Sequence, residues 1–252
     1  GYDPWLHTTA SVRALAGKLQ AKGIVLKALT SNPLDRTWGR DQPSPPIGSV
    51  IVQPLRYAGK SAADKISELQ KGLKGDGQDA VILTLPDSIA WLLNIRGSDV
   101  KHNPTPLAFA IVHASGKPEL FIDKRKLDGE VKRYLGDLVR LREPGDLDER
   151  VKALKEAKRK VRIDEASAAH WFRRKLGEKS KLVVDGRDPC IGPKARKNAA
   201  EIAGARAAHH EHPRDTEWHR TTSYRNRAIV NTGCRCCPRQ RNGQRSGSAG
   251  GE

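Results

Sequence analysis

The chain has 252 residues and a formal net charge of +17, with 30% charged and only 5% aromatic residues. This length can hold one large domain or two modest ones, and the core has to be mainly aliphatic. No apolar run approaches the roughly 20 residues that span a bilayer, and residues 1–10 lack the pattern of a secretory signal, so we expect neither a membrane span nor secretion.

The first segment predicts one helix followed by one strand. Thr8 or Thr9 can cap a helix whose apolar residues recur at helical spacing, and Gly23 would end it. The apolar run at 24–29 predicts a buried strand, and the five prolines of residues 31–59 predict a long loop. Because one helix and one strand cannot make a core, and because the chain contains no Met, we expect the true N-terminus to lie upstream.

Residues 60–190 alternate predicted helices and strands. Ser61 caps the first helix, with Asp64 at the capping-box position, and Gly75 and Gly77 end it. Further helices are expected at 127–135, 147–157 and 167–176, and strands at 79–84, 107–113, 119–122, 138–141, 160–163 and 182–184. Residues 114–117 would join two of these strands as a hairpin. The pattern predicts an α/β fold, with a mixed sheet and helices on its faces.

Residues 87–106 are the most informative stretch. A short apolar run at 89–93 predicts a helix, and a polar turn at 94–99 follows it. Arg96, Asp99 and His102 then form the one candidate constellation of the chain. An Arg can clamp a carboxylate with two hydrogen bonds, and an Asp can hold that Arg or an amine. An internal ion pair that fixes the turn is an equally good interpretation, and both stay open.

The remaining candidates favour structural roles. Cys190 is expected to be a small buried hydrophobe, and Glu143, which precedes Pro144-Gly145, is expected to lie in a solvated turn. Trp171 and Phe172 are expected to anchor a core, and His113 and His170 to be ordinary interior or surface histidines. We therefore name no catalytic residue and no metal ligand.

The C-terminal part changes character near residue 209. A helix is expected at 194–208, with Asn198 as a cap and Glu201 completing the box. From 209 onward there are eight Arg and no Lys, and apolar periodicity almost disappears. Three interpretations compete: a disordered basic tail, out-of-frame translation, and a metal site. The spacing of the candidate ligands is a poor match to known zinc sites. These ligands would be His209, His210, His212, His219, Cys234, Cys236 and Cys237.

The high positive charge raises the question of nucleic-acid binding. The basic residues are spread along the chain, and no helix-turn-helix, zinc-finger or RNA-binding signature lies among them. We therefore expect no specific nucleic-acid function.

Several segments, in the right order, resemble aminopeptidase P, the Xaa-Pro aminopeptidases of the creatinase/prolidase superfamily. The best of them is IAWLLNIRGSDVKHNPTPLAFAIVH at 89–113, which resembles the middle domain of that family. Others are GYDPWLHT at 1–8, NPLDRTW at 32–38, YAGKS at 57–61, ELFID at 119–123 and PKARKN at 193–198. The resemblance covers residues 1–209.

The resemblance implies a division into four parts. Residues 1–58 would be the C-terminal part of a first creatinase N-terminal-like domain, and residues 59–190 a complete middle domain. Residues 191–208 would be the first helix of a truncated catalytic domain of pita-bread fold, which is otherwise absent. Residues 209–252 would be an unrelated tail that is disordered or frameshifted.

The resemblance also implies an activity. The family removes an N-terminal residue that precedes proline, using a hydroxide held between two divalent metal ions, usually manganese, in the catalytic domain. We expect this chain alone to be inactive and to hold no cofactor. In this interpretation Arg96, Asp99 and His102 shape a substrate cleft or a structural turn. Proline-containing peptides, a homodimer and a cytoplasmic location are expected for the full-length enzyme. The alternative is a stand-alone basic module that binds nucleic acid or a protein partner.

Overall fold

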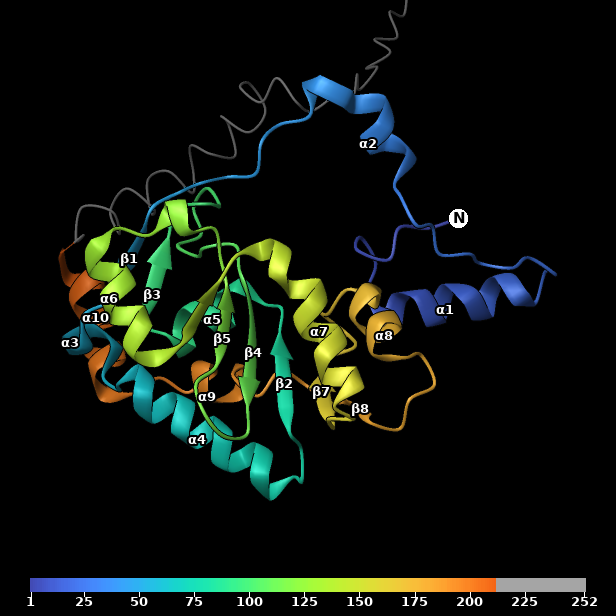
Figure 1. Ribbon diagram of the computed structural model, residues 1–252. Coiled ribbons are helices and arrows are strands. Elements are labelled where there is room, and N and C mark those ends of the chain that lie inside the picture. The colour runs from blue at the N-terminus through green and yellow to red at the C-terminus, as the bar shows by residue number, and fades with distance from the viewer. Residues whose placement is uncertain (212–252) are drawn as a thin grey trace, which may run out of the picture. The chain divides into compact units, whose positions relative to one another are not determined.

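A six-stranded mixed sheet organises the first 202 residues, which form one compact unit (Figure 1). The strand order is β6-β5-β4-β2-β7-β8. The pairs β2–β4 and β4–β5 are antiparallel, and the pairs β2–β7, β5–β6 and β7–β8 are parallel. The strands are β2 (Ala80–Leu83), β4 (Phe109–His113), β5 (Glu119–Phe121), β6 (Arg140–Arg142), β7 (Val161–Ile163) and β8 (Val183–Asp185). The expected α/β fold and the predicted hairpin are confirmed.

The computed structural model describes the backbone of residues 1–211 and the side chains of residues 1–209. Residues from 203 onward are grouped into a second unit, of which the described part is the continuation of one helix. Within the described residues, no helix is long and apolar enough to cross a membrane. The expectations for the segment from 212 onward, including its His and Cys ligands, lie outside the described residues.

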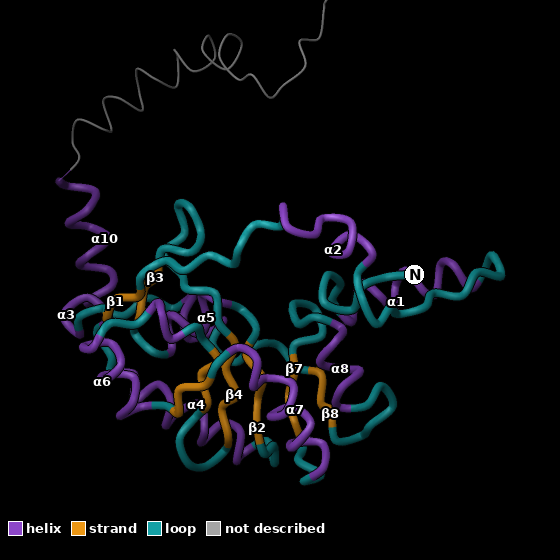
Figure 2. Tube along the Cα trace, turned by 45° about the horizontal axis from the view of Figure 1, so that its top comes forward, coloured by secondary structure: helices purple, strands orange, loops and turns teal. Residues whose placement is uncertain are grey.

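The two faces of the sheet carry separate apolar cores. Along β2, Val81 and Leu83 belong to one core and Ala80 and Ile82 to the other, because side chains alternate across a strand. The first core is covered by α4 (Ala62–Gly75), α5 (Pro86–Leu92) and α6 (Gly129–Leu138). The second is covered by α7 (Leu147–Glu156) and α8 (His170–Leu176) (Figure 2). Phe172 is fully buried in this second core.

The predicted start of α4 is confirmed at atomic detail. The Ser61 hydroxyl accepts a hydrogen bond from the backbone N–H of Asp64 at 3.0 Å. The helix places Ile66 and Leu73 against the first core, and Gly77, with φ of +62°, follows its end. Two short 3-10 turns, η2 (Lys124–Lys126) and η3 (Pro144–Asp146), precede α6 and α7.

A second, two-stranded sheet corrects two sequence-based expectations. β1 (Val50–Val52) lies in the segment predicted to be loop, and β3 (Ile95–Gly97) lies in the segment predicted to be a polar turn. The two pair antiparallel, with Ile51 opposite Arg96. Each has three residues and a partner distant in sequence, so neither produces a recognisable period. Gly97 is required here, because a Cβ would lie 2.6 Å from the backbone N of Pro106.

The N-terminal segment departs further from expectation. The helix α1 (Thr9–Gln20) is capped by Thr8 as predicted, but the expected strand at 24–29 is wrong. Only Ala28 forms a bridge, to Tyr2, and Val25 is 88% exposed. The apolar run has no neighbouring strand to cover it within the described residues. Three short elements follow: α2 (Pro33–Trp38), η1 (Gly39–Asp41) and α3 (Leu55–Ala58).

The helix expected at 194–208 is divided into two. A short helix, α9 (Ile191–Ala195), ends at Arg196, whose backbone is extended. The helix α10 (Ala199–Glu211) then begins after Asn198. Asparagine is more favourable as a helix cap than inside a helix, because as a cap its side chain accepts a hydrogen bond from an unpaired N–H of the first turn. This preference explains why α10 begins after Asn198.

Candidate functional site

Asp99 is the most highly connected of the three predicted site residues. Its Oδ1 accepts a hydrogen bond from the N–H of Gly48 at 2.8 Å, and its Oδ2 accepts one from the N–H of Leu107 at 2.7 Å. The ammonium of Lys126 also donates to Oδ2, at 2.6 Å. The Asp99 side chain is fully buried, and that of Lys126 is 6% exposed. This carboxylate therefore ties three distant segments together.

Arg96 and His102 lie apart from this ion pair. Arg96 donates from Nη1 to the carbonyl of Ile95 at 2.8 Å, and burial lowers the pKa of Arg96 while Glu201 opposes that change. His102 is exposed, and its φ is +63°. Within residues 1–209, no hydrogen bond or ion pair joins the side chains of Arg96, Asp99 and His102. Sequence reasoning missed Lys126, which is one of three consecutive basic residues and carries no separate signal.

A second polar cluster surrounds the end of α5. The buried Lys65 ammonium donates to the carbonyl of Trp91 at 2.8 Å and to Oδ1 of Asn94 at 2.7 Å. It also lies 4.2 Å from the centre of the Trp91 ring, within the range of a cation–π interaction. Burial lowers the pKa of Lys65 to about 8, although the charge of Glu201 opposes this.

The same neighbourhood holds the start of α10. Oδ1 of Asn198 accepts from the N–H of Glu201 at 3.0 Å, and Oε2 of Glu201 accepts from the N–H of Asn198 at 2.9 Å, so the predicted capping box is confirmed. Nδ2 of Asn198 donates to the carbonyl of Ala58 at 2.8 Å. Gly59 is required beside it, because a Cβ would lie 2.3 Å from Oδ1 of Asn198.

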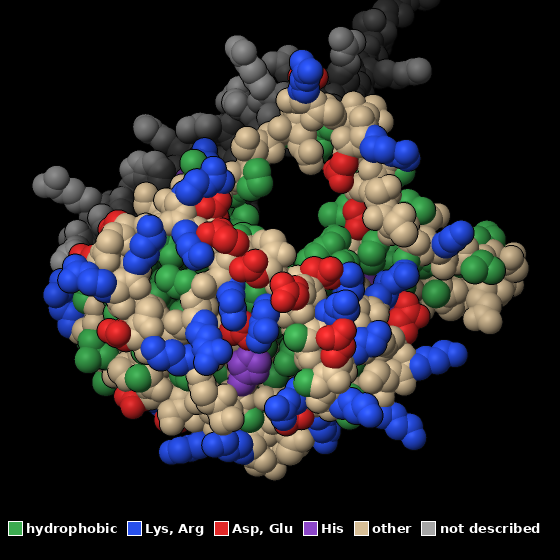
Figure 3. Space-filling view, viewed as in Figure 1, with side chains coloured by type: hydrophobic (Ala, Val, Ile, Leu, Met, Phe, Trp, Pro, Cys, Tyr) green, Lys and Arg blue, Asp and Glu red, His purple; other side chains and the backbone are tan. Residues whose placement is uncertain are grey.

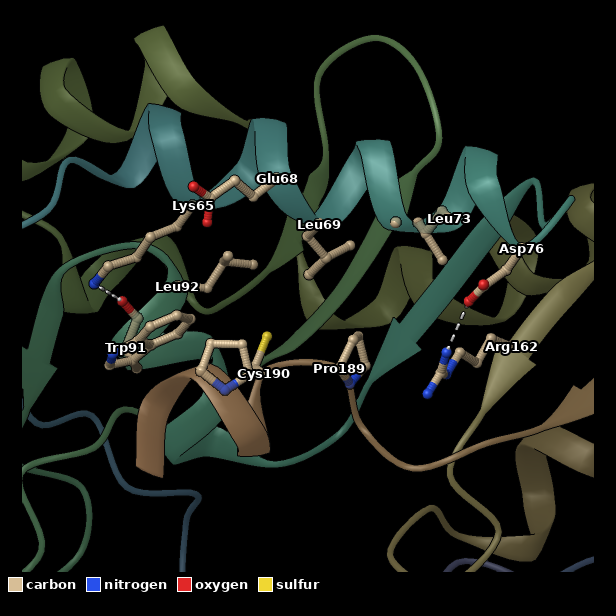
Figure 4. Close-up of a pocket in the computed structure, with 12 residues that line it drawn as sticks. Lys65, Glu68, Leu69, Leu73, Asp76, Trp91, Leu92, Arg162, Pro189 and Cys190 are labelled. Atoms are coloured by element: carbon tan, nitrogen blue, oxygen red, sulfur yellow. Dashed lines mark hydrogen bonds and ion pairs between the residues drawn. The ribbon is translucent and has the colours of Figure 1, made fainter. Parts of the chain in front are cut away.

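A pocket of about 210 Å³, which we call the α4 pocket, lies next to this cluster (Figure 4). Helix α4 forms one wall, and α5 together with the start of α9 forms the opposite wall. Its apolar lining consists of Leu69, Leu73, Trp91, Leu92, Pro189 and Pro193. Cys190 also lines it and is 1% exposed, as expected of a small hydrophobe. Burial raises the pKa of its thiol, which makes Cys190 a poor nucleophile.

Charged residues of the α4 pocket are matched by neighbours within the protein. Arg162 contacts Asp76 at 3.4 Å (Figure 4). It also donates from Nη2 to the carbonyl of Arg187 at 2.5 Å. Glu68 pairs with Lys60, and Lys65 is held as described above.

A buried charge cluster lies at the end of β4 and the start of β5, on the side of the second core. Glu119 accepts hydrogen bonds from Arg150 at 2.8 and 2.9 Å and from Arg142 at 3.1 Å, and its Oε1 lies 2.9 Å from Nε2 of His113. Burial alone would raise the pKa of Glu119, but the hydrogen bonds from His113 and Arg150 outweigh it and lower the pKa to about 2. The cluster is an internally satisfied ion network.

Two other residues have the structural environments expected of them. Nδ1 of the buried His170 lies 2.6 Å from the Tyr2 hydroxyl, and burial lowers the pKa of His170. Glu143 begins the exposed turn η3, where its N–H donates to Asp146 at 3.1 Å.

The described residues contain no group of three or more His, Cys, Asp or Glu side chains that could hold a metal ion. They therefore provide no donor set for the two metal ions that the resemblance implies, and we derive no metal-dependent step for them.

Comparison with known proteins supplies the context. The family model described as the creatinase/prolidase N-terminal domain matches residues 41–201. A probable Xaa-Pro aminopeptidase P from Ajellomyces dermatitidis is 36% identical over an alignment of 220 residues, and the match covers 83% of this chain and 36% of the relative. One from Aspergillus clavatus is 38% identical over an alignment of 216 residues, and the match covers 83% of this chain and 32% of the relative. The chain thus spans about a third of the length of these curated relatives.

A solved structure agrees with these matches. The X-prolyl aminopeptidase from Caenorhabditis elegans, described as a cytosolic enzyme with a di-nuclear active site, superimposes with a TM-score of 0.75 at 28% identity. The match covers 83% of this chain and 34% of that one.

Proposed function

The chain belongs to the creatinase/prolidase N-terminal domain family, and from that membership we propose that it forms the N-terminal, non-catalytic part of a metal-dependent Xaa-Pro aminopeptidase. The observation that carries the proposal is the structural similarity to the C. elegans enzyme, which covers 83% of this chain at a TM-score of 0.75. Since residues 1–209 offer no metal donor set, we further propose that the 252-residue chain does not cleave peptides alone.

We propose the four-part division at 58/59, 190/191 and 208/209. The family match to residues 41–201 is consistent with a middle domain at 59–190, which contains most of the matched residues. The Asn198 cap supports a new element after α9, since a reciprocal capping box begins a helix there.

For the full-length enzyme we propose two manganese ions, proline-containing peptides as substrates, a homodimer and a cytoplasmic location. The di-nuclear site and cytosolic description of the C. elegans enzyme support the metal count and the location. Asp99, through its buried pair with Lys126, is assigned to a structural turn. Arg96 and His102 are assigned to the surface that borders the substrate cleft of the complete enzyme.

A chimera tests the proposal. Residues 1–198 would replace the matching segment of the A. dermatitidis relative, whose remaining residues complete both ends, and release of Ala from the peptide Ala-Pro-Ala would be measured with added Mn²⁺. We expect cleavage by the chimera and none by the 252-residue chain. Cleavage by the 252-residue chain, or an inactive chimera whose circular dichroism shows a folded protein, would contradict it.

The charge of +17 favours a second candidate, a stand-alone basic module that binds a nucleic acid or an acidic protein. This candidate requires that binding depend on residues 209–252, which carry eight Arg and no Lys. Deleting those residues separates the two candidates.

A further inference from the structure

We propose that the α4 pocket is a binding site for a small, neutral aromatic molecule of about the size of indole. The proposal concerns only residues of the first compact unit and is independent of the peptidase assignment.

The size and lining of the pocket indicate this class of ligand. Its volume of about 210 Å³ exceeds the roughly 150 Å³ of an engineered apolar cavity that binds benzene. Leu69 and Leu73 project from α4 toward Leu92 and Pro189 on the opposite side, so a flat ring would contact aliphatic carbon on both faces (Figure 4). Apolar walls with few polar groups are typical of small-molecule sites.

Charges around the pocket argue that the ligand is neutral. Lys65 already donates to Trp91 and Asn94, and Arg162 is held by Asp76 and the carbonyl of Arg187. A charged ligand would compete with these existing partners for Lys65 or Arg162, or would lie against apolar side chains, and both cost free energy. A neutral ring has to break none of them.

Gly72 supplies an independent observation. It lies in the interior of α4, where glycine is less favourable than alanine. No close packing requires it, because a Cβ at this position would meet no atom within 4 Å. Gly72 lines the pocket, so its missing side chain leaves the cavity open at that point.

Titration with indole tests the proposal on the 252-residue chain. We expect saturable shifts of the backbone amide signals of residues 69–73 in ¹H–¹⁵N NMR spectra, with a Kd of about 1 mM or tighter. Indole-3-acetate and tryptamine carry the same ring with a negative and a positive charge, and each is expected to bind several-fold more weakly. Tighter binding of either charged compound would overturn the assignment to a neutral ligand.

Two glycine substitutions in the same helix provide matched variants. Gly72→Leu places a side chain in the pocket, so we expect it to abolish indole binding and raise the melting temperature. Gly75→Leu makes the same change at a position that does not line the pocket and has equally open surroundings, so binding should persist. Absence of saturable shifts in the unmodified chain, or equal indole affinity in both variants, would overturn the proposal.

Discussion

At the scale of single residues, Asp99 shows what the sequence can and cannot indicate about a site. Its position after a buried helix and beside turn residues was sufficient to select it. Its partner was not predictable, because Lys126 lies 27 residues away among other basic residues and only the fold brings the two together. Arg96, which is closer in sequence, bonds to its own neighbour Ile95 instead. Of the two interpretations left open, the geometry around Asp99 favours an ion pair that fixes the turn.

Asp99→Asn should destabilise the fold strongly. The Lys126 side chain is only 6% exposed, and the substitution removes the carboxylate that pairs with its ammonium. Breaking a buried ion pair in this way lowers the free energy of unfolding by about 3–5 kcal/mol. We expect a loss of this order in the unfolding free energy measured by urea denaturation. Adding Lys126→Met to Asp99→Asn should recover a large part of it, since the unpaired charge is then removed.

Asp148→Asn is the matched control for Asp99→Asn. Asp148 pairs with Lys175 at 2.6 Å, but the two side chains are 56% and 42% exposed. An exposed pair contributes about 1 kcal/mol or less, so this variant should remain close to the unmodified chain. Equal losses for Asp99→Asn and Asp148→Asn would show that burial of the first pair does not matter.

At the scale of elements, prediction succeeded where signals are local. The Ser61 cap, the apolar run of β2 and the hairpin of β4 and β5 each depend on neighbouring residues, and all three are confirmed. The strands β1 and β3 were not predicted, because a three-residue strand is defined by its partner rather than by its own pattern. The prediction of a strand at 24–29 was wrong for the opposite reason. The sequence there has the pattern of a strand, yet it forms only a single bridge, at Ala28. The α4 pocket was equally hidden, since its walls come from separate elements.

Asn198→Ala should weaken the beginning of α10. The change removes the acceptor for the Glu201 N–H and the hydrogen bond to the Ala58 carbonyl, and losing such a cap costs about 1–2 kcal/mol. We expect the Glu201 amide to exchange with deuterium at least several-fold faster.

Asn198→Ser separates the two roles of this side chain. Serine also accepts a hydrogen bond as a cap, but it is too short to keep the amide bond to Ala58. In Asn198→Ser, the Glu201 amide should therefore exchange with deuterium at a rate between those of the unmodified chain and Asn198→Ala. Unchanged exchange in Asn198→Ala would mean that the capping box does not hold the helix.

At the scale of the whole molecule, the strand order was beyond sequence reasoning. Alternating helices and strands indicate a mixed sheet, but they do not place β2 between β4 and β7. Parallel pairing of β2 with β7 joins residues 80 and 161, and no local pattern encodes that contact. The distribution of charge is different, because it can be read from the sequence. Lys and Arg are scattered over the viewed face with Asp and Glu among them (Figure 3).

This distribution separates the two candidate functions. Residues 1–208 contain 38 Lys and Arg and 25 Asp and Glu, a formal charge of +13, so residues 209–252 contribute only +4 of the total of +17. Binding that arises from general charge should therefore survive deletion of 209–252 with a modest loss of affinity. Binding by a dedicated basic tail should disappear with it.

We expect the first of these outcomes. Fluorescence anisotropy with two short DNA duplexes of unrelated sequence should give equal, weak affinities that fall steeply between about 50 and 200 mM salt, because phosphate contacts release counterions. The chain ending at residue 208 should bind both duplexes with a somewhat smaller salt dependence. A preference for one duplex, or complete loss of binding on deletion, would instead favour the stand-alone basic module, because diffuse charge can produce neither result.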